Sequence, residues 1–229
     1  MQLSGVTIAF DLDGTLVETA PDLIGSLNVV LGERGLPALP VESARGLVGA
    51  GARALIERGF AEAGEPLTEA ETPGLVTRFI AVYRSRIASE SRPFPDVEAA
   101  LDQLAAAGAL LAVCTNKPTD LSNLLLEALG MADRFKAVIG ADSAPQRKPH
   151  PSHLLHTIGA AGGDPSRALM VGDSRADADA AKNAGVACIL VPYGYTDVPV
   201  ETLGADLVIQ TFADLPAAAE RLLGGRATT

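Results

Sequence analysis

The apolar residues of this chain fall into short continuous runs, most of which are separated by segments with helical spacing. The runs of strand length are residues 6–10, 109–115, 136–140, 168–173 and 187–191, with a weaker one at 206–210. Continuous apolar runs, unlike alternating ones, are typical of parallel strands buried on both faces. Helical segments lie between the later runs, and three of them end in glycine directly after the last apolar position. This alternation predicts right-handed βαβ units and a doubly wound α/β sheet.

The interval between the first and second runs breaks this alternation. Residues 17–92 have helical spacing and contain no strand-length run, and they form a far longer connection than one crossover helix requires. We therefore predict a Rossmann-like core made of residues 1–16 and 93–229. Residues 17–92 are predicted to form a helical cap domain inserted after the first strand, with RPFPD, residues 92–96, as the return linker.

Composition limits the class of partner. The chain of 229 residues has a formal net charge of -10 and no basic cluster, so nucleic acid and anionic membrane surfaces are not expected partners. The apolar stretch that begins at Leu104 is too short to cross a bilayer, and no positively charged segment precedes the first apolar run. We therefore expect a cytoplasmic protein. Cys114 and Cys188 lie in predicted strands and are expected to be buried free thiols.

Polar residues gather at the carboxyl ends of the predicted strands, where open parallel sheets bind their ligands. They are Asp11, Asp13, Gly14 and Thr15 after the first run, Thr115, Asn116 and Lys117 after the second, Lys148 in a later turn, and Asp173, Ser174 and Asp177 after the fourth. Two carboxylates about 5 Å apart, as expected for Asp11 and Asp13, repel each other by roughly 3 kcal/mol at an effective dielectric constant near 20. Converging carboxylates without a histidine form an oxygen-donor set that suits Mg²⁺ and suits zinc poorly, and such an ion offsets this repulsion.

A bound Mg²⁺ commonly shares its ligands with a phosphate. The chain offers further phosphate-binding groups beside the carboxylates, namely a hydroxyl, an amide, a lysine, and backbone N–H groups around Gly14 and Thr15. The sequence therefore predicts phosphoryl transfer from a small phosphorylated metabolite. No GxxxxGK motif is present, so the phosphate would be held differently from that of a P-loop nucleotidase. Among the lysines, Lys148 is preferred over Lys117 as the cation that neutralises the phosphate.

Four phrases of the sequence, DLDGT, CTN, KP and GDSRAD, occur in this order with a helical insertion after the first. In order and spacing they resemble the haloacid dehalogenase superfamily of aspartate-nucleophile hydrolases, and the resemblance covers nearly the whole chain. It implies that Asp11 is the nucleophile, which forms an aspartyl-phosphate. It also implies that Asp13 is the general acid for the leaving alcohol and then the base for water.

The same resemblance implies the remaining roles at the site. Thr115 and Lys148 would bind the transferring phosphoryl group. Thr115 and Asn116 have a simpler alternative role, which is to cap the helix that follows them. The implied Mg²⁺ site consists of Asp11, Asp173 and the main-chain carbonyl of Asp13, with Asp177 in support.

Within this superfamily, the phrases ETAPDL, RPFPDV, TNKP and VGDSRADADAAKNAG are most similar to those of the phosphoglycolate phosphatases. The implied reaction is the hydrolysis of 2-phosphoglycolate to glycolate and phosphate. That group usually has Asp where this chain has Glu18 and a more basic or glycine-rich residue where it has Ala141, which bears on the substrate rather than on the reaction.

Other functions remain open at this stage. The enzyme alternatives are a phosphatase for another small phosphate ester and a sugar phosphomutase, which uses the same pair of aspartates. A non-catalytic alternative is a phospho-receiver module, which the large insertion argues against. A dehalogenase is disfavoured, because that branch needs neither a second aspartate at position 13 nor a metal.

The predicted cap carries its own candidate contacts for the substrate. GLVGAGARAL, residues 46–55, contains a GxG pattern but lacks the preceding strand and third glycine of a dinucleotide-binding fingerprint. It is either a plain loop before a helix or a loop over the site, in which Arg53 binds the carboxylate of the substrate. The expected substrate-binding residues are Gly14, Thr15, Asn116, Gly49, Gly51 and Arg53.

Three histidines, His150, His153 and His156, have a spacing that could suggest zinc. No fourth ligand of the right type lies nearby in the sequence, so surface or core roles are favoured for them. The sequence does not indicate an oligomeric state.

Overall fold

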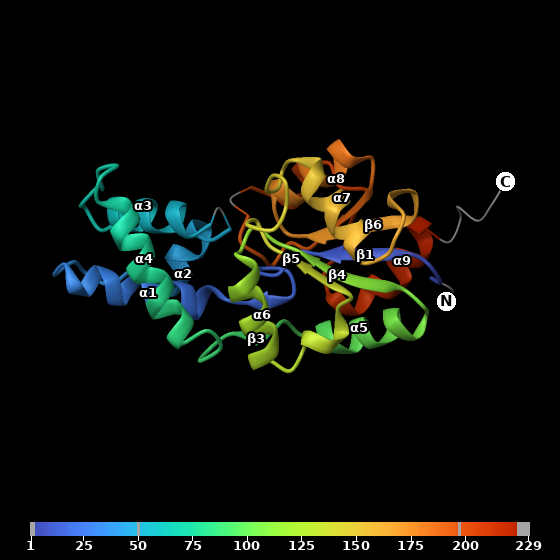
Figure 1. The fold of residues 1–229 in the computed structure, drawn as a ribbon, viewed down its shortest axis with the longest axis horizontal. Coiled ribbons are helices and arrows are strands. Elements are labelled where there is room, and N and C mark those ends of the chain that lie inside the picture. Colours follow the sequence, from blue (N-terminus) through green and yellow to red (C-terminus); the bar gives the residue numbers. More distant parts are fainter. Residues whose placement is uncertain (1–2, 50, 197, 224–229) are drawn as a thin grey trace.

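The central sheet is parallel throughout. The structure, a computed structural model, describes residues 3–49, 51–196 and 198–223, and within them six strands form this sheet in the order β5-β4-β1-β6-β7-β8 (Figure 1). They are β1 (Thr7–Phe10), β4 (Leu110–Cys114), β5 (Ala137–Ile139), β6 (Ala168–Gly172), β7 (Ala187–Leu190) and β8 (Leu207–Val208). Each strand coincides with one of the apolar runs of the sequence. The predicted doubly wound α/β sheet is therefore confirmed.

Strand β1 lies at the centre of the sheet, between β4 and β6. In register, Phe10 lies opposite Val113 on one side and Val171 on the other. The three strands therefore end at the same level, and their following loops leave the sheet side by side. This is the point where the strand order reverses, which is where such sheets bind ligands.

Helices cover both faces of the sheet (Figure 1). On one face α7 (Pro151–Ala160) packs against α8 (Arg175–Ala184), and on the other lie α5 (Val97–Ala106) and α9 (Leu215–Leu223), while α6 (Thr119–Ala128) packs beside β5. Short 3-10 helices occur at Arg45–Leu47, Ala132–Arg134, Pro165–Arg167, Val200–Leu203 and Phe212–Asp214. Gly185 follows α8 with φ 67°, a left-handed conformation that glycine adopts at low cost and that ends the helix.

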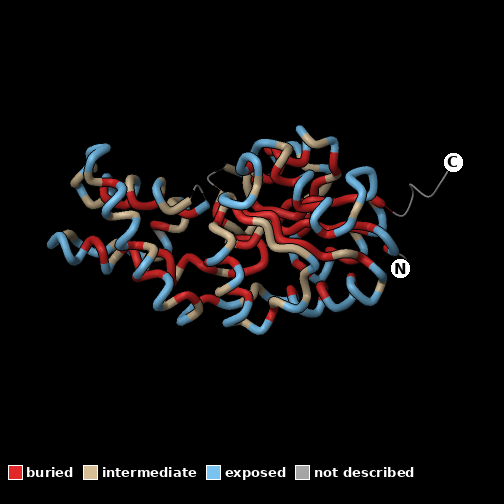
Figure 2. The backbone as a smooth tube through the Cα atoms, in the orientation of Figure 1, coloured by how far each residue is buried: buried red, intermediate tan, exposed pale blue. Residues whose placement is uncertain are grey.

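The insertion folds into helices, as predicted, and extends from one end of the sheet, at the left of Figure 1. Its helices are α1 (Ala20–Glu33), α2 (Val41–Ala44), α3 (Ala52–Glu62) and α4 (Thr72–Ser85). Their apolar faces meet inside the cap, where Leu27, Phe60 and Phe79 are almost fully buried. Figure 2 shows buried segments within the cap as well as in the sheet. A Cβ on Gly59 would lie 2.5 Å from the Leu27 side chain, so this glycine lets α1 and α3 approach closely.

A small antiparallel ribbon joins the cap to the core. Strand β2 (Val17–Glu18) pairs with β3 (Arg92–Pro93), so the expectation that residues 17–92 contain no strand is wrong at both of its ends. Two-residue strands are too short to show any periodicity in the sequence. The division of the chain at residues 16 and 92 stays a prediction.

Buried Asp22, near the start of α1, stabilises the two segments that connect the cap to the core, which we call the hinge. Its Oδ2 accepts hydrogen bonds from the backbone N–H groups of Glu90 (3.0 Å) and Ser91 (2.8 Å) and from the Ser91 hydroxyl (2.8 Å). The start of α1 is therefore tied to the segment that returns to the core.

Among the described residues, no helix has both the length and the apolar character needed to cross a membrane.

Candidate active site

The loop after β1 is a tight turn that brings backbone and carboxylates together. Gly14 has φ 87°, and a Cβ there would lie 2.7 Å from Asp173 Oδ2, so only glycine fits. The Gly14 N–H, which the sequence reading left free for phosphate, instead donates to the carbonyl of Val17 (3.0 Å) and closes the turn. The Thr15 hydroxyl is buried and donates to Asp173 Oδ1 (2.9 Å), so it orients a carboxylate. In this structure both groups are thus engaged by hydrogen bonds within the protein, and their expected role in substrate binding stays a prediction.

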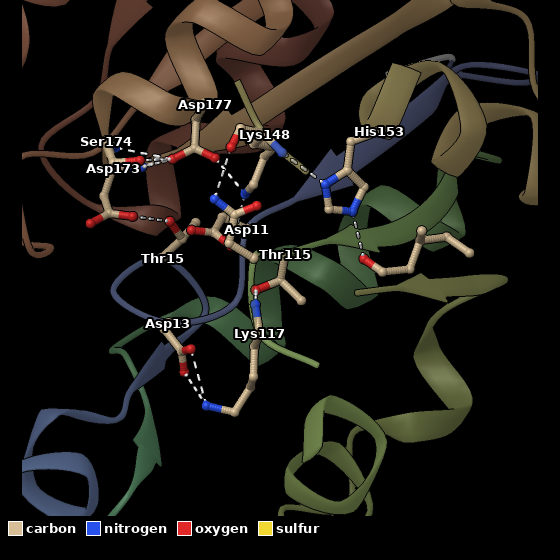
Figure 3. A network of polar contacts seen from close by, with 12 residues as sticks. Asp11, Asp13, Thr15, Thr115, Lys117, Lys148, His153, Asp173, Ser174 and Asp177 are labelled. Atoms are coloured by element: carbon tan, nitrogen blue, oxygen red, sulfur yellow. Dashed lines mark hydrogen bonds and ion pairs between the residues drawn. The ribbon is translucent and has the colours of Figure 1, made fainter. Parts of the chain in front are cut away.

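Three carboxylates converge at the ends of β1 and β6 (Figure 3). Oxygens of Asp11, Asp173 and Asp177 all lie within 4.8 Å of one another. Burial raises the pKa of Asp11 to about 6, and the neighbouring carboxylates add to this rise although Lys148 opposes it. Burial, followed by the charge of Asp11, also raises the pKa of Asp173 well above its usual value. The negative charge of these carboxylates therefore exceeds the positive charge around them. A divalent cation such as Mg²⁺, bound by their oxygens, would offset the excess.

Asp177 owes its position to the start of α8. Its Oδ2 accepts hydrogen bonds from the Ser174 hydroxyl (2.6 Å) and from the backbone N–H of Ser174 (3.1 Å) and Asp173 (3.3 Å). A carboxylate in the first turn of a helix is stabilised by the free N–H groups there. Asp177 is fully buried, and its other oxygen faces Lys148.

Lys148 is the cation that lies within this cluster, and its predicted role toward the phosphate stays a prediction. Its Nζ lies 2.6 Å from Asp177 Oδ1 and 3.0 Å from Asp11 Oδ1 (Figure 3). Burial alone would lower the pKa of Lys148, but the ion pairs with these two carboxylates outweigh burial and raise it. The lysine therefore stays charged where a phosphoryl group would need neutralisation.

His153, which the sequence reading placed on the surface or in the core, is buried beneath Lys148. Its Nδ1 accepts a hydrogen bond from the Lys148 backbone N–H (3.1 Å), so Nε2 carries the proton and donates to the carbonyl of Ile139 (3.1 Å). Burial and the nearby Lys148 charge lower the pKa of His153 to about 4. A neutral histidine thus supports the turn that presents the lysine. Within the described residues, the cluster that could hold a metal is the aspartate cluster and not one of histidines.

Thr115 and Asn116 follow β4 and point toward the site rather than capping α6. The residue before α6 is Pro118, and the Thr115 hydroxyl accepts a hydrogen bond from the backbone N–H of Lys117 (3.2 Å). The Asn116 amide donates to the carbonyl of Lys148 (3.1 Å). The loop after β4 is thereby linked to the turn that carries Lys148.

Asp13 lies apart from the acidic cluster and pairs with a different lysine (Figure 3). Lys117 Nζ lies 2.9 Å from one Asp13 carboxylate oxygen and 3.0 Å from the other. Burial alone would lower the pKa of Lys117, but Asp13 and Tyr83 outweigh burial and raise it. Sequence reasoning gave Lys117 no partner, because Asp13 is too distant along the chain for any local pattern to join them.

Two cavities reach the aspartates between cap and core. The smaller has a volume of about 60 Å³ and the larger, more open one about 370 Å³, and both are lined by Asp11, Asp13, Asn116 and Gly49. Gly51 lines the smaller cavity only, and Ala50 between these two glycines lies outside the described residues.

Arg53 departs from the expectation. It lines neither of these cavities, and its guanidinium pairs with Glu57 (2.8 Å) and Glu69 (2.5 Å) on the cap surface. Two nearby carboxylates satisfy its charge there. The substrate contact expected of Arg53 stays a prediction, and in this structure Arg53 pairs with two glutamates instead of facing either cavity.

Glu18, next to the start of the cap, contacts both the cap and the core, which the sequence did not predict. Glu18 accepts hydrogen bonds from Arg45 of the cap (2.5 Å) and from the hydroxyl of Tyr195 in the core (2.6 Å). The backbone N–H of Tyr195 donates to Asp173 Oδ2 (2.6 Å). The position of the cap is thus linked through one residue to a carboxylate of the acidic cluster.

A parallel sheet whose central strands end in a carboxylate cluster, with a helical cap inserted after the first strand, is a capped Rossmann-like fold with an acidic site. The chain belongs to the haloacid dehalogenase-like hydrolases, whose family model matches residues 8–191.

Relatives extend over nearly the whole chain. A phosphoglycolate phosphatase from Caulobacter vibrioides is 58% identical over 221 residues, which cover 96% of this chain and 93% of that one. The crystal structure of a predicted phosphoglycolate phosphatase from Haemophilus somnus has a TM-score of 0.86 at 34% identity, covering 95% of this chain and 99% of that one. The crystal structure of CbbY from Rhodobacter sphaeroides in complex with phosphate has a TM-score of 0.76 at 25% identity, covering 91% and 95%. The chain is thus a phosphoric monoester hydrolase similar to the phosphoglycolate phosphatases.

Proposed function

We propose that the chain hydrolyses 2-phosphoglycolate to glycolate and phosphate through an aspartyl-phosphate on Asp11, with Mg²⁺ as cofactor. The observation that carries the substrate is the 58% identity, over almost the entire chain, to a protein named phosphoglycolate phosphatase. The convergence of Asp11, Asp173, Asp177 and Lys148 supports the reaction.

The acidic cluster suits a magnesium ion. Asp11 and Asp173 would supply carboxylate oxygens to the ion. The family resemblance implies the main-chain carbonyl of Asp13 as a further ligand and Asp177 as a supporting residue. The donor set is oxygen alone, which suits a hard cation. Bound there, Mg²⁺ would supply charge neutralisation for an approaching phosphate dianion.

The residues of the chain divide the remaining work. The Asp11 carboxylate attacks phosphorus, forming an acyl-phosphate bond while the ester P–O bond breaks. Asp13 gives a proton to the leaving alcohol, and then takes one from the water that attacks the acyl-phosphate. Lys148 and the Thr115 hydroxyl hold and neutralise the transferring group. Asp11 is regenerated when phosphate leaves.

Phosphate release from a panel of small phosphate esters tests this function. We expect 2-phosphoglycolate to have the highest kcat/KM of the panel. Release of an isomerised sugar phosphate without inorganic phosphate would identify a phosphomutase instead. A phosphorylated protein that does not turn over would identify a phospho-receiver module.

Removal of metal tests the cofactor in the same assay. EDTA should abolish turnover of every ester, because each carboxylate repels the phosphate by about 1–4 kcal/mol at effective dielectric constants between those of water and the protein surface. Added Mg²⁺ should restore the activity. Full activity in a demetallated sample would contradict the proposed cofactor.

A further inference from the structure

Lys117 is a buried cation that faces the smaller cavity. Its side chain is 4% exposed, and it pairs with Asp13 while lying 4.5 Å from the centre of the Tyr83 ring. An ammonium group has three N–H donors, and the two Asp13 oxygens account for two of them. The third can serve the Tyr83 hydroxyl, whose proximity raises the pKa of Lys117, or a ligand in the cavity.

Tyr83, on α4 of the cap, contributes the second polar group. The residue is 1% exposed, and its hydroxyl makes no hydrogen bond to the described residues. Burial raises the pKa of Tyr83 to about 12, so the hydroxyl keeps its proton and can donate it. A buried hydroxyl without a hydrogen-bond partner costs free energy. A ligand in the cavity that accepts a hydrogen bond from the Tyr83 hydroxyl would remove this cost.

The cavity itself limits what that ligand can be. Its volume is about 60 Å³, enough for a few groups of the size of water. Apolar side chains from cap and core form most of its wall, namely Leu23, Val48, Leu55, Phe79 and Leu121. Among its described lining residues, Lys117 is the basic one. The acidic lining residues are Asp11 and Asp13, and Asp13 pairs with Lys117. Lys117 is therefore the group in this cavity to which a short acceptor can bind.

We propose that Lys117 and Tyr83 form the subsite that binds the carboxylate of the substrate, with the phosphoryl group lying toward Asp11. Lys117 provides an ion pair to the carboxylate and Tyr83 donates a hydrogen bond to it. Because Lys117 belongs to the core and Tyr83 to the cap, the subsite is complete only with the cap over the core. The proposal rests on the proposed function and names the residues that select within it.

The test compares two esters of similar size on the full-length enzyme with Mg²⁺. The measured quantity is the ratio of kcat/KM for 2-phosphoglycolate to kcat/KM for ethyl phosphate, which lacks the carboxylate. We expect Tyr83→Phe to lower this ratio about five- to tenfold, mainly through the KM for 2-phosphoglycolate, and Lys117→Met to lower it by about 30-fold or more. Lys182→Met, the same substitution at an exposed position on α8, should keep the wild-type ratio.

A binding measurement separates recognition from turnover. In an Asp11→Asn background, where the nucleophile is absent, each added variant should weaken calorimetric binding of 2-phosphoglycolate by a similar factor. Tyr83→Phe keeps the ring that lies over Lys117, so it keeps the test valid if Lys117→Met fails to fold.

Three outcomes would overturn the proposal. Equal losses on both esters would show that Lys117 only holds Asp13 in place. If the wild-type enzyme prefers 2-phosphoglycolate and neither variant loses activity on either ester, the carboxylate is bound elsewhere. The proposed function would then still hold. A wild-type enzyme with no preference for 2-phosphoglycolate would instead refute the proposed function, and the subsite with it.

Discussion

The core and the cap use charged side chains in opposite ways. The core buries Asp173, Asp177 and Lys148 together, with each residue at most 2% exposed. The cap places ion pairs on its surface, where the side chains are 39–84% exposed, among them Arg34–Glu65, Arg53–Glu69 and Arg78–Glu33. Exposed pairs contribute about 0–1 kcal/mol each, whereas a buried charge costs several kcal/mol and needs compensation. The difference supports the proposal that the buried charges of the core serve the reaction, whereas these exposed pairs of the cap lie on its surface.

Toward the smaller cavity, the cap presents uncharged groups, whereas Arg58 of the cap lines the larger one. Leu23, Leu55, Phe79 and the Tyr83 ring line the smaller cavity from the cap side. Such groups can select a substrate by size and by one hydrogen bond, but they cannot move a proton or neutralise a phosphate. The comparison therefore predicts that variants of the acidic cluster lower the turnover of every ester. Variants that line the smaller cavity, from the cap or at Lys117, change the preference among esters.

The largest effect is expected at the nucleophile. Asp11→Asn keeps the shape of the side chain and removes the attacking oxygen anion, so kcat should fall at least about 10⁴-fold on every ester. Steady-state phosphate release from 2-phosphoglycolate and p-nitrophenyl phosphate measures this. An unchanged circular dichroism spectrum would exclude unfolding as the cause, and a loss confined to one ester would break the division of labour between core and cap.

A smaller, leaving-group-dependent effect is expected at Asp13. Asp13→Asn removes the proton donor, so kcat should fall about 10²- to 10⁴-fold for an alkyl ester and less for p-nitrophenyl phosphate, whose leaving group needs no proton. Hydrolysis of the aspartyl-phosphate should also slow, so that intact-protein mass spectrometry detects a phosphorylated chain after quenching. Equal losses on both esters, with no phosphorylated chain, would contradict the role assigned to Asp13.

Much of this core was predictable from the sequence, because the information is local there. Each buried strand is a continuous apolar run, and the aspartates of the cluster directly follow strands or open a helix. Asp177 illustrates this, since its spacing from Ser174 is that of a capping box. Family resemblance then supplied the roles that spacing could not.

The contacts between cap and core were not predictable in this way. Lys117 contacts Tyr83 and Asp13, and Tyr195 contacts Glu18, although these residues are far apart in the sequence. The hydrophobic periodicity of the sequence carries no information on such contacts. The hinge strands are two residues long, below the length at which alternation can be recognised. The sequence therefore predicts the reacting groups better than the groups that choose the substrate.

The buried histidine of the core should make stability depend on pH. The pKa of His153 is lowered from 6.5 to about 4 in the folded protein, so the unfolded chain binds the extra proton first. The contribution is therefore complete above pH 6.5 and is lost as the pH falls toward 4, by up to about 3 kcal/mol in the free energy of unfolding. Urea denaturation of wild type and His153→Gln at several pH values measures it.

The controls for this prediction lie on the same helix. His156→Gln, at an exposed position of α7, should keep the pH dependence of the wild type. If His153→Gln keeps it as well, the acid sensitivity comes from other groups of the core.

The smallest effect is expected at Arg53, where the sequence suggested a large one. Its side chain is 50% exposed and pairs with Glu57 and Glu69, and it lines neither cavity. Arg53→Ala should therefore change the KM for 2-phosphoglycolate less than about twofold, since exposed ion pairs contribute little and no substrate contact is lost. Lys117→Met is the matched comparison, because it removes a buried cation that does line the smaller cavity. A tenfold rise in KM in Arg53→Ala, confined to 2-phosphoglycolate, would show that Arg53 leaves its glutamates when substrate binds, and the cap would then contribute charge as well as shape.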